Sequence, residues 1–150
     1  MAEIIKQDIT SVTHGTIAHQ VNCQGAMGAG VAKVISNKHP KVRQDYLSLC
    51  EKTSPEDLFG RYQVVHIAET DVDVVNIFSQ LTYGNAYKTG KVYTDVDKLV
   101  AVLKHICNDP HLQKPIHIPF GIGCGLAGAS WAELFAKIKD LPLIICKLTS

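Results

Sequence analysis

The sequence lacks any large excess of charge of one sign. Its 15 lysine and arginine residues nearly balance its 14 aspartate and glutamate residues, which leaves a formal net charge of +1. A nonspecific DNA or RNA binder needs a basic surface that neutralises phosphates and releases counterions, and no run of basic residues occurs in this chain. We therefore expect no dedicated nucleic-acid binding.

Long hydrophobic runs and paired cysteines are also missing. No apolar stretch approaches the roughly 20 residues of a membrane-spanning helix, and Met1–Lys6 lacks the basic start and apolar stretch of a secretory signal. The five cysteines are dispersed, odd in number and never spaced as CxxC, which argues against a disulfide framework or a thiolate zinc site. We therefore expect a cytoplasmic protein that has no membrane segment.

The composition suits one folded domain. Hydrophobic residues make up 46% of the 150 positions and charged residues 19%, a balance typical of compact globular proteins. No repeat, low-complexity stretch or linker divides the chain. Residues 1–150 are therefore expected to form a single domain.

Strand-like and helix-like stretches alternate along the chain, which predicts an α/β fold. Strands are expected at Thr16–Asn22, Gly60–Ala68, Val72–Phe78, Ile116–Pro119 and Leu143–Leu148, the second and third as a hairpin that makes the sheet mixed. Helices are expected from Gly30 to His39, from Pro40 through Cys50, from about Thr94 onward and from Ser130 to about Asp140. The stretch Ser79–Val92 follows neither period and is expected to be a surface loop near the site.

Two glycine-rich loops, Gly25–Gly30 and Gly121–Gly128, each follow a predicted strand and precede a predicted helix. Glycine permits positive φ and lets a phosphate approach the backbone with no Cβ in the way. The helix that follows offers unpaired N–H groups and the positive end of its dipole. Because both loops lie at strand ends of one sheet, we expect them to line one crevice and to grip an anionic nucleotide from both sides.

Four segments carry a family resemblance in their order along the chain: Gln7–Thr10, His19–Asn22, Gly28–Ala32 and Gly121–Leu126. Together they resemble the macro domain family over essentially the whole chain. Within that family the chain looks closest to the branch of ADP-ribose 1″-phosphate phosphatases and ADP-ribose deglycosylases. The resemblance implies a three-layer α/β/α fold around a central mixed sheet, with ADP-ribose in a cleft at the C-terminal edge of the strands.

The resemblance also implies a set of ligand contacts. Asp8 matches the position that accepts a hydrogen bond from the adenine amino group, Ile9 matches the adjacent backbone contact, and Leu148 matches an apolar position beside the adenine. Gln24 is expected to orient the ribose or a water molecule. The other expected contacts lie in the two loops or just after the Val72–Phe78 strand: Gly28, Ala29, Gly30, Val31, Ser79, Gly121, Ile122, Gly123, Cys124, Gly125 and Leu126.

Two positions argue against the chemistry of the deglycosylases in this family, which use a lysine and an aspartate. Alignment of the motifs places Gln80 at the lysine position and Ala127 at the aspartate position. A carboxamide cannot form a Schiff-base-type adduct with the sugar, and a methyl group cannot transfer a proton. The lysine-based mechanism is therefore not expected in this chain.

His19 and Asn22 are the expected catalytic residues. Both match the His-x-x-Asn motif of the phosphatases, and imidazole exchanges protons near neutrality because its unperturbed pKa is about 6.5. We expect His19 to assist the attack of water on the 1″-phosphate or to protonate the leaving sugar oxygen, while loop amides stabilise the transferred phosphoryl group. A structural histidine in the core would show the same pattern, and so would an asparagine that bonds a turn.

The sequence thus predicts a hydrolase of ADP-ribose 1″-phosphate that needs neither metal nor cofactor, since no histidines have HxH or HExxH spacing. Two alternatives stay open. One is a noncatalytic module that binds ADP-ribose, free or linked to a protein. The other is a hydrolase of a different ADP-ribose conjugate that counteracts ADP-ribosylation.

Overall fold

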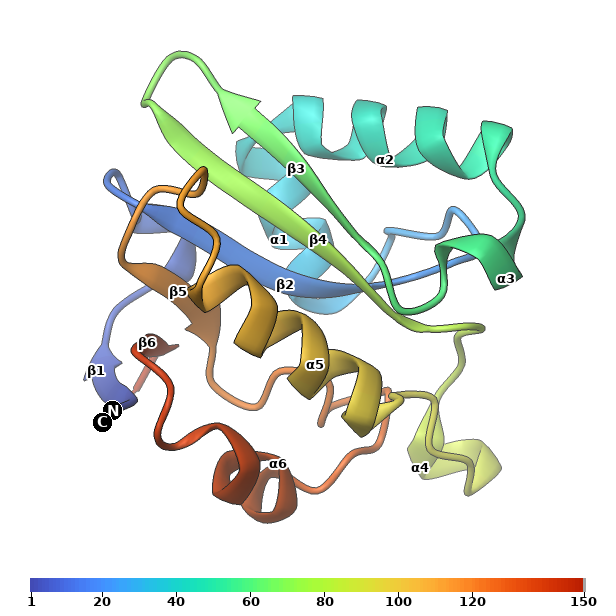
Figure 1. Cartoon of the computed structure of the whole chain (residues 1–150). Coiled ribbons are helices and arrows are strands. Elements are labelled where there is room, and N and C mark those ends of the chain that lie inside the picture. Colours follow the sequence, from blue (N-terminus) through green and yellow to red (C-terminus); the bar gives the residue numbers. More distant parts are fainter. Residues whose placement is uncertain (150) are drawn as a thin grey trace.

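A computed structural model describes residues 1–149 and shows a mixed β-sheet between two layers of helices (Figure 1). In these residues the sheet has six strands, in the order β1-β6-β5-β2-β4-β3. The strands are β1 (Glu3–Lys6), β2 (Thr16–Asn22), β3 (Tyr62–Ile67), β4 (Val72–Gln80), β5 (Ile116–Pro119) and β6 (Leu143–Lys147). Strand β3 runs antiparallel to β4, whereas the other neighbours are parallel. The predicted α/β/α fold with a mixed sheet is confirmed.

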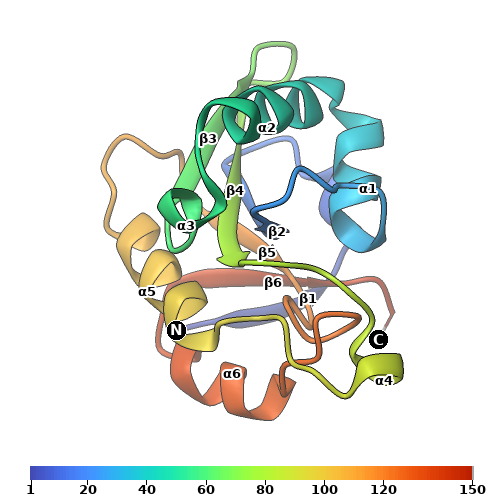
Figure 2. The ribbon, with the colours of Figure 1, turned by 90° about the vertical axis from the view of Figure 1, so that its right-hand side faces the viewer.

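The helices cover both faces of the sheet. They are α1 (Gly30–Lys38), α2 (Pro40–Lys52), α3 (Pro55–Leu58), α4 (Ala86–Thr89), α5 (Val96–Cys107) and α6 (Trp131–Ile138), with a 3-10 turn, η1 (Ile9–Ser11), after β1. Figures 1 and 2 show α1 and α2 on one face and α5 and α6 on the other. Within residues 1–149, no helix combines the length and the apolar character needed to cross a membrane.

Several local predictions hold, and some are wrong. Ser130 caps α6 by accepting a hydrogen bond from the Glu133 N–H, as its spacing predicts. Helix α5 instead begins at Val96 and is capped by the Asp95 carboxylate, which accepts from the Lys98 N–H, while the Thr94 hydroxyl bonds to the second glycine loop. The predicted loop Ser79–Val92 contains the end of β4 and the short helix α4. Strand β1 and helix α3 were not predicted from the sequence.

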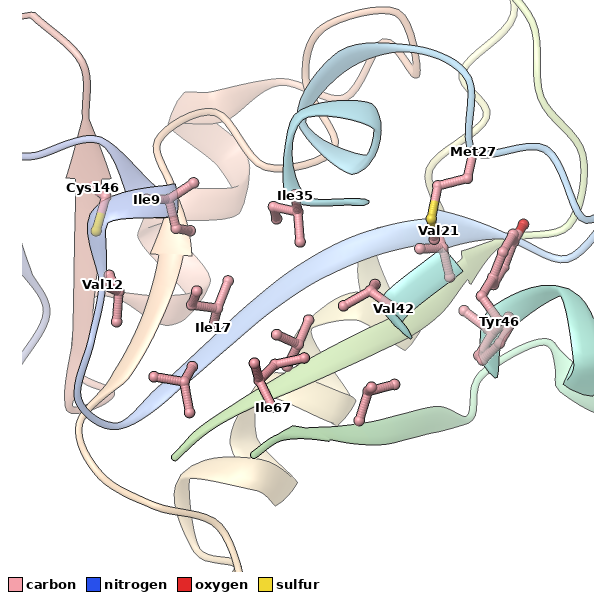
Figure 3. Close-up of a cluster of buried hydrophobic side chains, with 14 of the residues drawn as sticks. Ile9, Val12, Ile17, Val21, Met27, Ile35, Val42, Tyr46, Ile67 and Cys146 are labelled. Atoms are coloured by element: carbon pink, nitrogen blue, oxygen red, sulfur yellow. The ribbon is translucent and has the colours of Figure 1, made fainter. Parts of the chain in front are cut away.

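One hydrophobic cluster fixes α1 and α2 on the sheet. Ile17 and Val21 lie on the same face of β2, because residues four apart in a strand point to the same side. There they meet Ile35 of α1 and Val42 of α2 (Figure 3). Ile17, Ile35 and Val42 are fully buried. Because α1 is held against β2 in this way, the start of α1 stays at the end of β2.

A second cluster occupies the other face. Leu99, Leu103 and Ile106 recur at helical spacing on α5 and are fully buried against Val75 and other apolar residues of the sheet. Helix α6 adds Leu134 and Ile138 to the same cluster. The chain therefore passes from β2 to helices on one face and from β5 to α6 on the other. Adjacent parallel strands whose connections diverge in this way leave a crevice at their C-terminal ends, where α/β proteins bind ligands.

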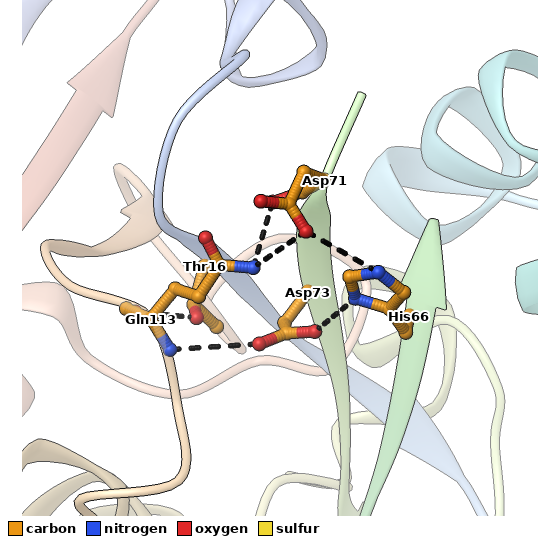
Figure 4. A network of polar contacts seen from close by, with 5 residues as sticks. All are labelled: Thr16, His66, Asp71, Asp73 and Gln113. Carbon is orange, nitrogen blue, oxygen red and sulfur yellow. Dashed lines mark hydrogen bonds and ion pairs between the residues drawn. The ribbon is translucent and has the colours of Figure 1, made fainter. Parts of the chain in front are cut away.

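A network of polar contacts connects the N-terminal ends of the parallel strands, at the edge of the sheet opposite to the crevice (Figure 4). The carboxylate of Asp73, at the start of β4, lies 2.8 Å from His66 Nδ1 and 3.5 Å from the Gln113 N–H. The Thr16 hydroxyl donates to the Gln113 carbonyl at 2.6 Å, and the Gln113 side chain donates to the Asp71 carbonyl at 2.7 Å. These bonds join β2, the β3–β4 hairpin and the segment before β5 far from the crevice.

We predict that Asp73→Ala lowers the free energy of unfolding by about 1–3 kcal/mol, because it removes a buried carboxylate together with its hydrogen bonds from the His66 ring and the Gln113 N–H. Urea denaturation monitored by circular dichroism measures the change. His66→Ala is the control: the His66 side chain is 51% exposed, so its removal should cost less than about 1 kcal/mol. Equal stability of Asp73→Ala and the wild type would contradict a supporting role for this network.

Candidate functional site

A cavity of about 600 Å³ lies at the C-terminal ends of β2 and β5, a volume in the range of small-molecule sites. Four groups of residues line it: the end of β2 from His19 to Asn22, the first glycine loop with the start of α1, four of the residues from Gln80 to Asn85, and the residues from Pro119 to Ala127 other than Cys124. Among the described residues, no aspartate, glutamate, lysine or arginine contributes to the lining. An anionic ligand would therefore be held by neutral donors.

The first glycine loop is shaped by Asn22. Its side-chain oxygen accepts hydrogen bonds from the N–H groups of Gln24 (2.9 Å) and Ala26 (3.3 Å), and its amide nitrogen donates to the Ala26 carbonyl at 2.6 Å. From α2, the buried Tyr46 hydroxyl lies 2.7 Å from the Asn22 carbonyl and 2.9 Å from its side-chain oxygen. The polar atoms of the Asn22 side chain are thus engaged in forming the loop, the role that asparagine commonly takes in turns.

Helix α1 starts at the cavity without a capping side chain. Its N-cap residue, Ala29, makes no side-chain hydrogen bond, and the N–H groups of Gly30 and Val31 donate to no acceptor in residues 1–149. Such unpaired N–H groups, at the positive end of the helix dipole, form a binding site for anions. A Cβ added at Gly28 or Gly30 would meet no atom within 4 Å, so a ligand can approach the backbone here.

The second loop contains glycines of two kinds. Gly121 and Gly125 face open space, since a Cβ added there would meet nothing within 4 Å. Gly123 and Gly128 face protein instead, with φ angles of 73° and 83°. A Cβ at Gly123 would lie 3.0 Å from the Thr94 side chain, and one at Gly128 would lie 2.6 Å from the Ala86 Cβ. Gly121 and Gly125 therefore leave room for a ligand, whereas Gly123 and Gly128 let the loop pack closely against Thr94 and Ala86.

His19 borders the cavity, although only 1% of its surface is exposed. Its Nε2 lies 2.6 Å from the Asn76 side-chain oxygen on β4, so Nε2 carries the proton and donates it. Its Nδ1 is buried and has no hydrogen-bond partner in the described chain. Burial lowers the pKa of His19 to about 4, against a weaker opposing effect of the bond to Asn76. The imidazole is therefore neutral at physiological pH, with an unused lone pair on Nδ1.

Three residues predicted to contact the adenine lie outside the cavity lining. Asp8 is exposed and caps η1, where its carboxylate accepts bonds from the Thr10 N–H (2.9 Å) and hydroxyl (2.8 Å) that lower its pKa. Ile9 is buried in the cluster below α1. Leu148 follows β6 and is 71% exposed. Asp8 and Leu148 therefore sit at the ends of β1 and β6, the paired strands beyond β5.

Three other predicted contacts also lie outside the lining. Gln24 is exposed and donates to the Leu81 carbonyl at 2.9 Å, which ties the first loop to the segment after β4. Ser79 is fully buried, and its hydroxyl donates to Gln20. The Cys124 thiol donates to the Ile122 carbonyl, and burial raises its pKa, so it is not a thiolate. In the structure these three side chains support the loops rather than face the cavity.

The cavity includes residues that were not predicted as ligand contacts. Gln20, Gln80, Tyr83, Asn85 and Phe120 all line it. Tyr83 and Asn85 precede α4, which lies beside the second loop in Figure 2, where the Ala86 N–H donates to the Leu126 carbonyl at 2.8 Å. This pairing depends on tertiary packing, and the only hint in the sequence is the irregular stretch after β4.

Within residues 1–149, no group of three or more histidine, cysteine or acidic residues is arranged to hold a metal ion.

Comparison with known proteins identifies named relatives, although no protein-family model matches the chain. The chain is 30% identical over 152 residues to the ADP-ribose 1″-phosphate phosphatase of Candida glabrata, and the match covers 82% of each protein. It is 24% identical over 149 residues to the ADP-ribose 1″-phosphate phosphatase of Meyerozyma guilliermondii, with 86% of this chain and 85% of that protein covered.

Solved structures share the fold. A Bacteroides thetaiotaomicron protein of unknown function matches with a TM-score of 0.80 at 26% identity, over 99% of this chain and 98% of that one. The Thermosipho africanus DarTG protein, solved in complex with ADP-ribose, matches with a TM-score of 0.77 at 18% identity, over 97% of this chain and 41% of that one. The macrodomain of Mycobacterium tuberculosis DarG gives 0.67 at 19% identity, over 100% and 99%. From the relative with 30% identity and from this shared fold, we conclude that the chain belongs to the macro domain family.

Proposed function

We propose that this protein binds ADP-ribose and hydrolyses ADP-ribose 1″-phosphate to ADP-ribose and phosphate. The observation that carries the proposal is the uncharged cavity between two glycine loops whose open glycines expose backbone N–H groups. The relatives from Candida glabrata and Meyerozyma guilliermondii, both named ADP-ribose 1″-phosphate phosphatase, support the choice of substrate.

Backbone donors suit a diphosphate better than isolated side chains do. A helix start and a glycine loop present several N–H groups that are already ordered, so binding costs little additional conformational entropy. The N–H groups of Gly28 and Gly30 in the first loop, and of Gly121, Gly123 and Gly125 in the second, donate to no acceptor in the described part of the chain. We propose that the two phosphates lie between these two sets of donors.

The order of the strands gives the ligand a direction. Asp8 follows β1, the second loop follows β5, the first loop follows β2, and Gln80 ends β4; these strands are neighbours in the order β1-β6-β5-β2-β4. At a strand spacing of about 4.8 Å, the groups spread over roughly 19 Å, which suits an elongated ligand. We propose that the adenine lies toward Asp8, the diphosphate between the loops, and the distal ribose with its phosphate toward His19 and Gln80.

The environment of His19 favours one of its two proposed roles. An acid that protonates the leaving oxygen must be an imidazolium ion, and a pKa of about 4 makes that form scarce at neutral pH. The neutral ring instead offers the Nδ1 lone pair as a hydrogen-bond acceptor. Because Nδ1 is buried in the structure, we propose that a small rotation of the His19 ring on ligand binding brings Nδ1 to the cavity to orient the attacking water, while the loop N–H groups stabilise the charge on the transferred phosphoryl group.

A module that binds ADP-ribose without turning it over is the second candidate. The specific observation in its favour is that Gln80 and Ala127, which occupy the positions of the deglycosylase lysine and aspartate, both line the cavity. With these two residues and a neutral His19, the cavity offers backbone donors for binding but few groups for proton transfer.

We predict that the purified protein releases inorganic phosphate from ADP-ribose 1″-phosphate in the presence of a chelator. His19→Gln should lower kcat by about 100-fold, the usual contribution of one acid–base group, and should leave the Kd for ADP-ribose nearly unchanged. A colorimetric phosphate assay and calorimetry measure the two quantities. His117→Gln is the matched control, because His117 is also a buried strand histidine but bonds Thr16 at the opposite edge of the sheet. Wild-type turnover in His19→Gln would contradict the catalytic role, and tight binding without turnover in the wild type would favour the binding module.

We also predict that His19 makes the fold sensitive to acid. Because its folded-state pKa of about 4 lies below the ordinary 6.5, the unfolded chain binds more protons between these pH values, and stability falls as pH falls through this window. Between pH 7 and pH 4.5, His19→Gln should lose about 2 kcal/mol less unfolding free energy than the wild type. Urea denaturation of both proteins at both pH values measures the difference, and parallel losses would show that His19 is not buried as a neutral group.

A further inference from the structure

A half-buried glutamine, Gln20, connects the strands to the second glycine loop. Its side-chain nitrogen donates to the Thr94 hydroxyl at 2.8 Å and to the Gln80 side-chain oxygen at 3.0 Å, and its side-chain oxygen accepts a hydrogen bond from the Ser79 hydroxyl. One amide thus joins the end of β2, the end of β4 and the segment that leads into α5. Both protons and the oxygen of this amide are used within the protein.

Thr94 carries this connection into the loop. Because a glutamine nitrogen only donates, the Thr94 hydroxyl must accept from Gln20, and its single proton is left to be donated to the Gly123 carbonyl, 2.7 Å away. The loop rests directly on Thr94, since a Cβ at Gly123 would lie 3.0 Å from its side chain. The neighbouring backbone is held as well: the Tyr93 N–H donates to the Ala127 carbonyl at 2.8 Å, and the Asp95 N–H donates to the Ser79 carbonyl at 2.8 Å.

Gln20 also fixes the direction of Gln80. The Gln80 side-chain oxygen is occupied by Gln20, while its nitrogen makes only a long contact of 3.5 Å with the Thr82 carbonyl. Gln80 lines the cavity at the end of β4. The donor end of its amide is therefore available to a ligand oxygen.

We propose that Gln20 is a positioning residue for the phosphoryl end of the substrate. Through Thr94 it sets the Gly123 peptide, and with it the N–H groups of the second loop. Through the Gln80 side-chain oxygen it turns the Gln80 nitrogen toward the same end of the cavity. The inference rests on the proposed phosphatase function, because it specifies which part of the chain aligns the transferred group. The first loop, held by Asn22 and Tyr46, depends on other contacts.

The direction of the hydrogen bonds provides the test. Thr94→Val keeps the shape of the side chain and removes the hydroxyl. Gln20→Glu keeps the size but replaces the donor with acceptors, so the Thr94 proton turns to the carboxylate and leaves the Gly123 carbonyl. Thr94→Ser keeps the hydroxyl and should behave as the wild type. Thr16→Val is the matched control, because Thr16 is also buried and donates its hydroxyl to a carbonyl, but at the opposite edge of the sheet.

We expect Thr94→Val and Gln20→Glu to lower kcat for ADP-ribose 1″-phosphate by at least about tenfold, since small misplacements of positioning groups cost this much or more. Their KM, and the Kd for ADP-ribose, should rise by a smaller factor than kcat falls, because the donors of the first loop are unaffected and still bind the diphosphate. Thr16→Val should lose thermal stability much as Thr94→Val does and keep the wild-type kcat. Wild-type kcat in Thr94→Val and Gln20→Glu, or an equal loss in Thr16→Val, would overturn the proposal.

A second measurement separates this inference from the proposed function. Amide NMR spectra of the wild type and of Thr94→Val, each titrated with ADP-ribose, report on the second loop without any turnover. We expect the amide signals of Gly121, Gly123 and Gly125 to shift on binding in the wild type and to broaden or shift differently in Thr94→Val. If the wild type binds but hydrolyses nothing, the phosphatase proposal fails while this readout still tests the positioning. Identical second-loop responses in the two proteins would overturn the inference alone.

Discussion

The proposed function requires the cavity to hold an anion without a charged side chain of opposite sign, and the rest of the structure bears on this one constraint. Since no ionised side chain lines the cavity within residues 1–149, the attraction has to come from backbone N–H groups and from the start of α1. Such groups are fixed partial charges, and they act only when the surrounding backbone holds them toward one point. The near-neutral net charge of the chain agrees with a site that recognises its ligand at close range rather than by long-range steering.

Contacts beneath each loop hold its backbone N–H groups in place. Asn22 and the Tyr46 hydroxyl shape the first loop, and the apolar contact of α1 with β2 keeps the helix start beside it. Under the second loop, Thr94 supports Gly123. Two glycines, Gly123 and Gly128, are needed where loop and support touch. Gly121 and Gly125 face open space instead, so glycine in this loop allows close packing at two positions and leaves room for a ligand at two others.

Much of this could be predicted from the sequence, because it depends on local patterns. The alternation of strand-like and helix-like stretches predicted the α/β layers, the two glycine loops predicted the position of the cavity, and the Ser130 spacing predicted the start of α6. Contacts made between distant segments could not be predicted. Ser79 and Gln20 form a hydrogen bond only because β4 pairs with β2. The burial that lowers the pKa of His19 to about 4 likewise depends on segments distant in the sequence packing around its ring. Whether Asp8 and Leu148 contact adenine stays a prediction, since both lie beyond the cavity lining.

The central claim is that backbone donors in two loops bind ADP-ribose, and an isothermal titration of the protein with ADP-ribose tests it most directly. A Gly125→Val variant sharpens the test, because its new side chain would enter space that is now open, whereas Ala132→Val adds the same bulk on the exposed side of α6. The account predicts one bound ADP-ribose per chain, binding at least about tenfold weaker in Gly125→Val, equivalent to about 1.4 kcal/mol, and no change in Ala132→Val. The absence of ADP-ribose binding in the wild type, or equal affinity in Gly125→Val, would contradict it.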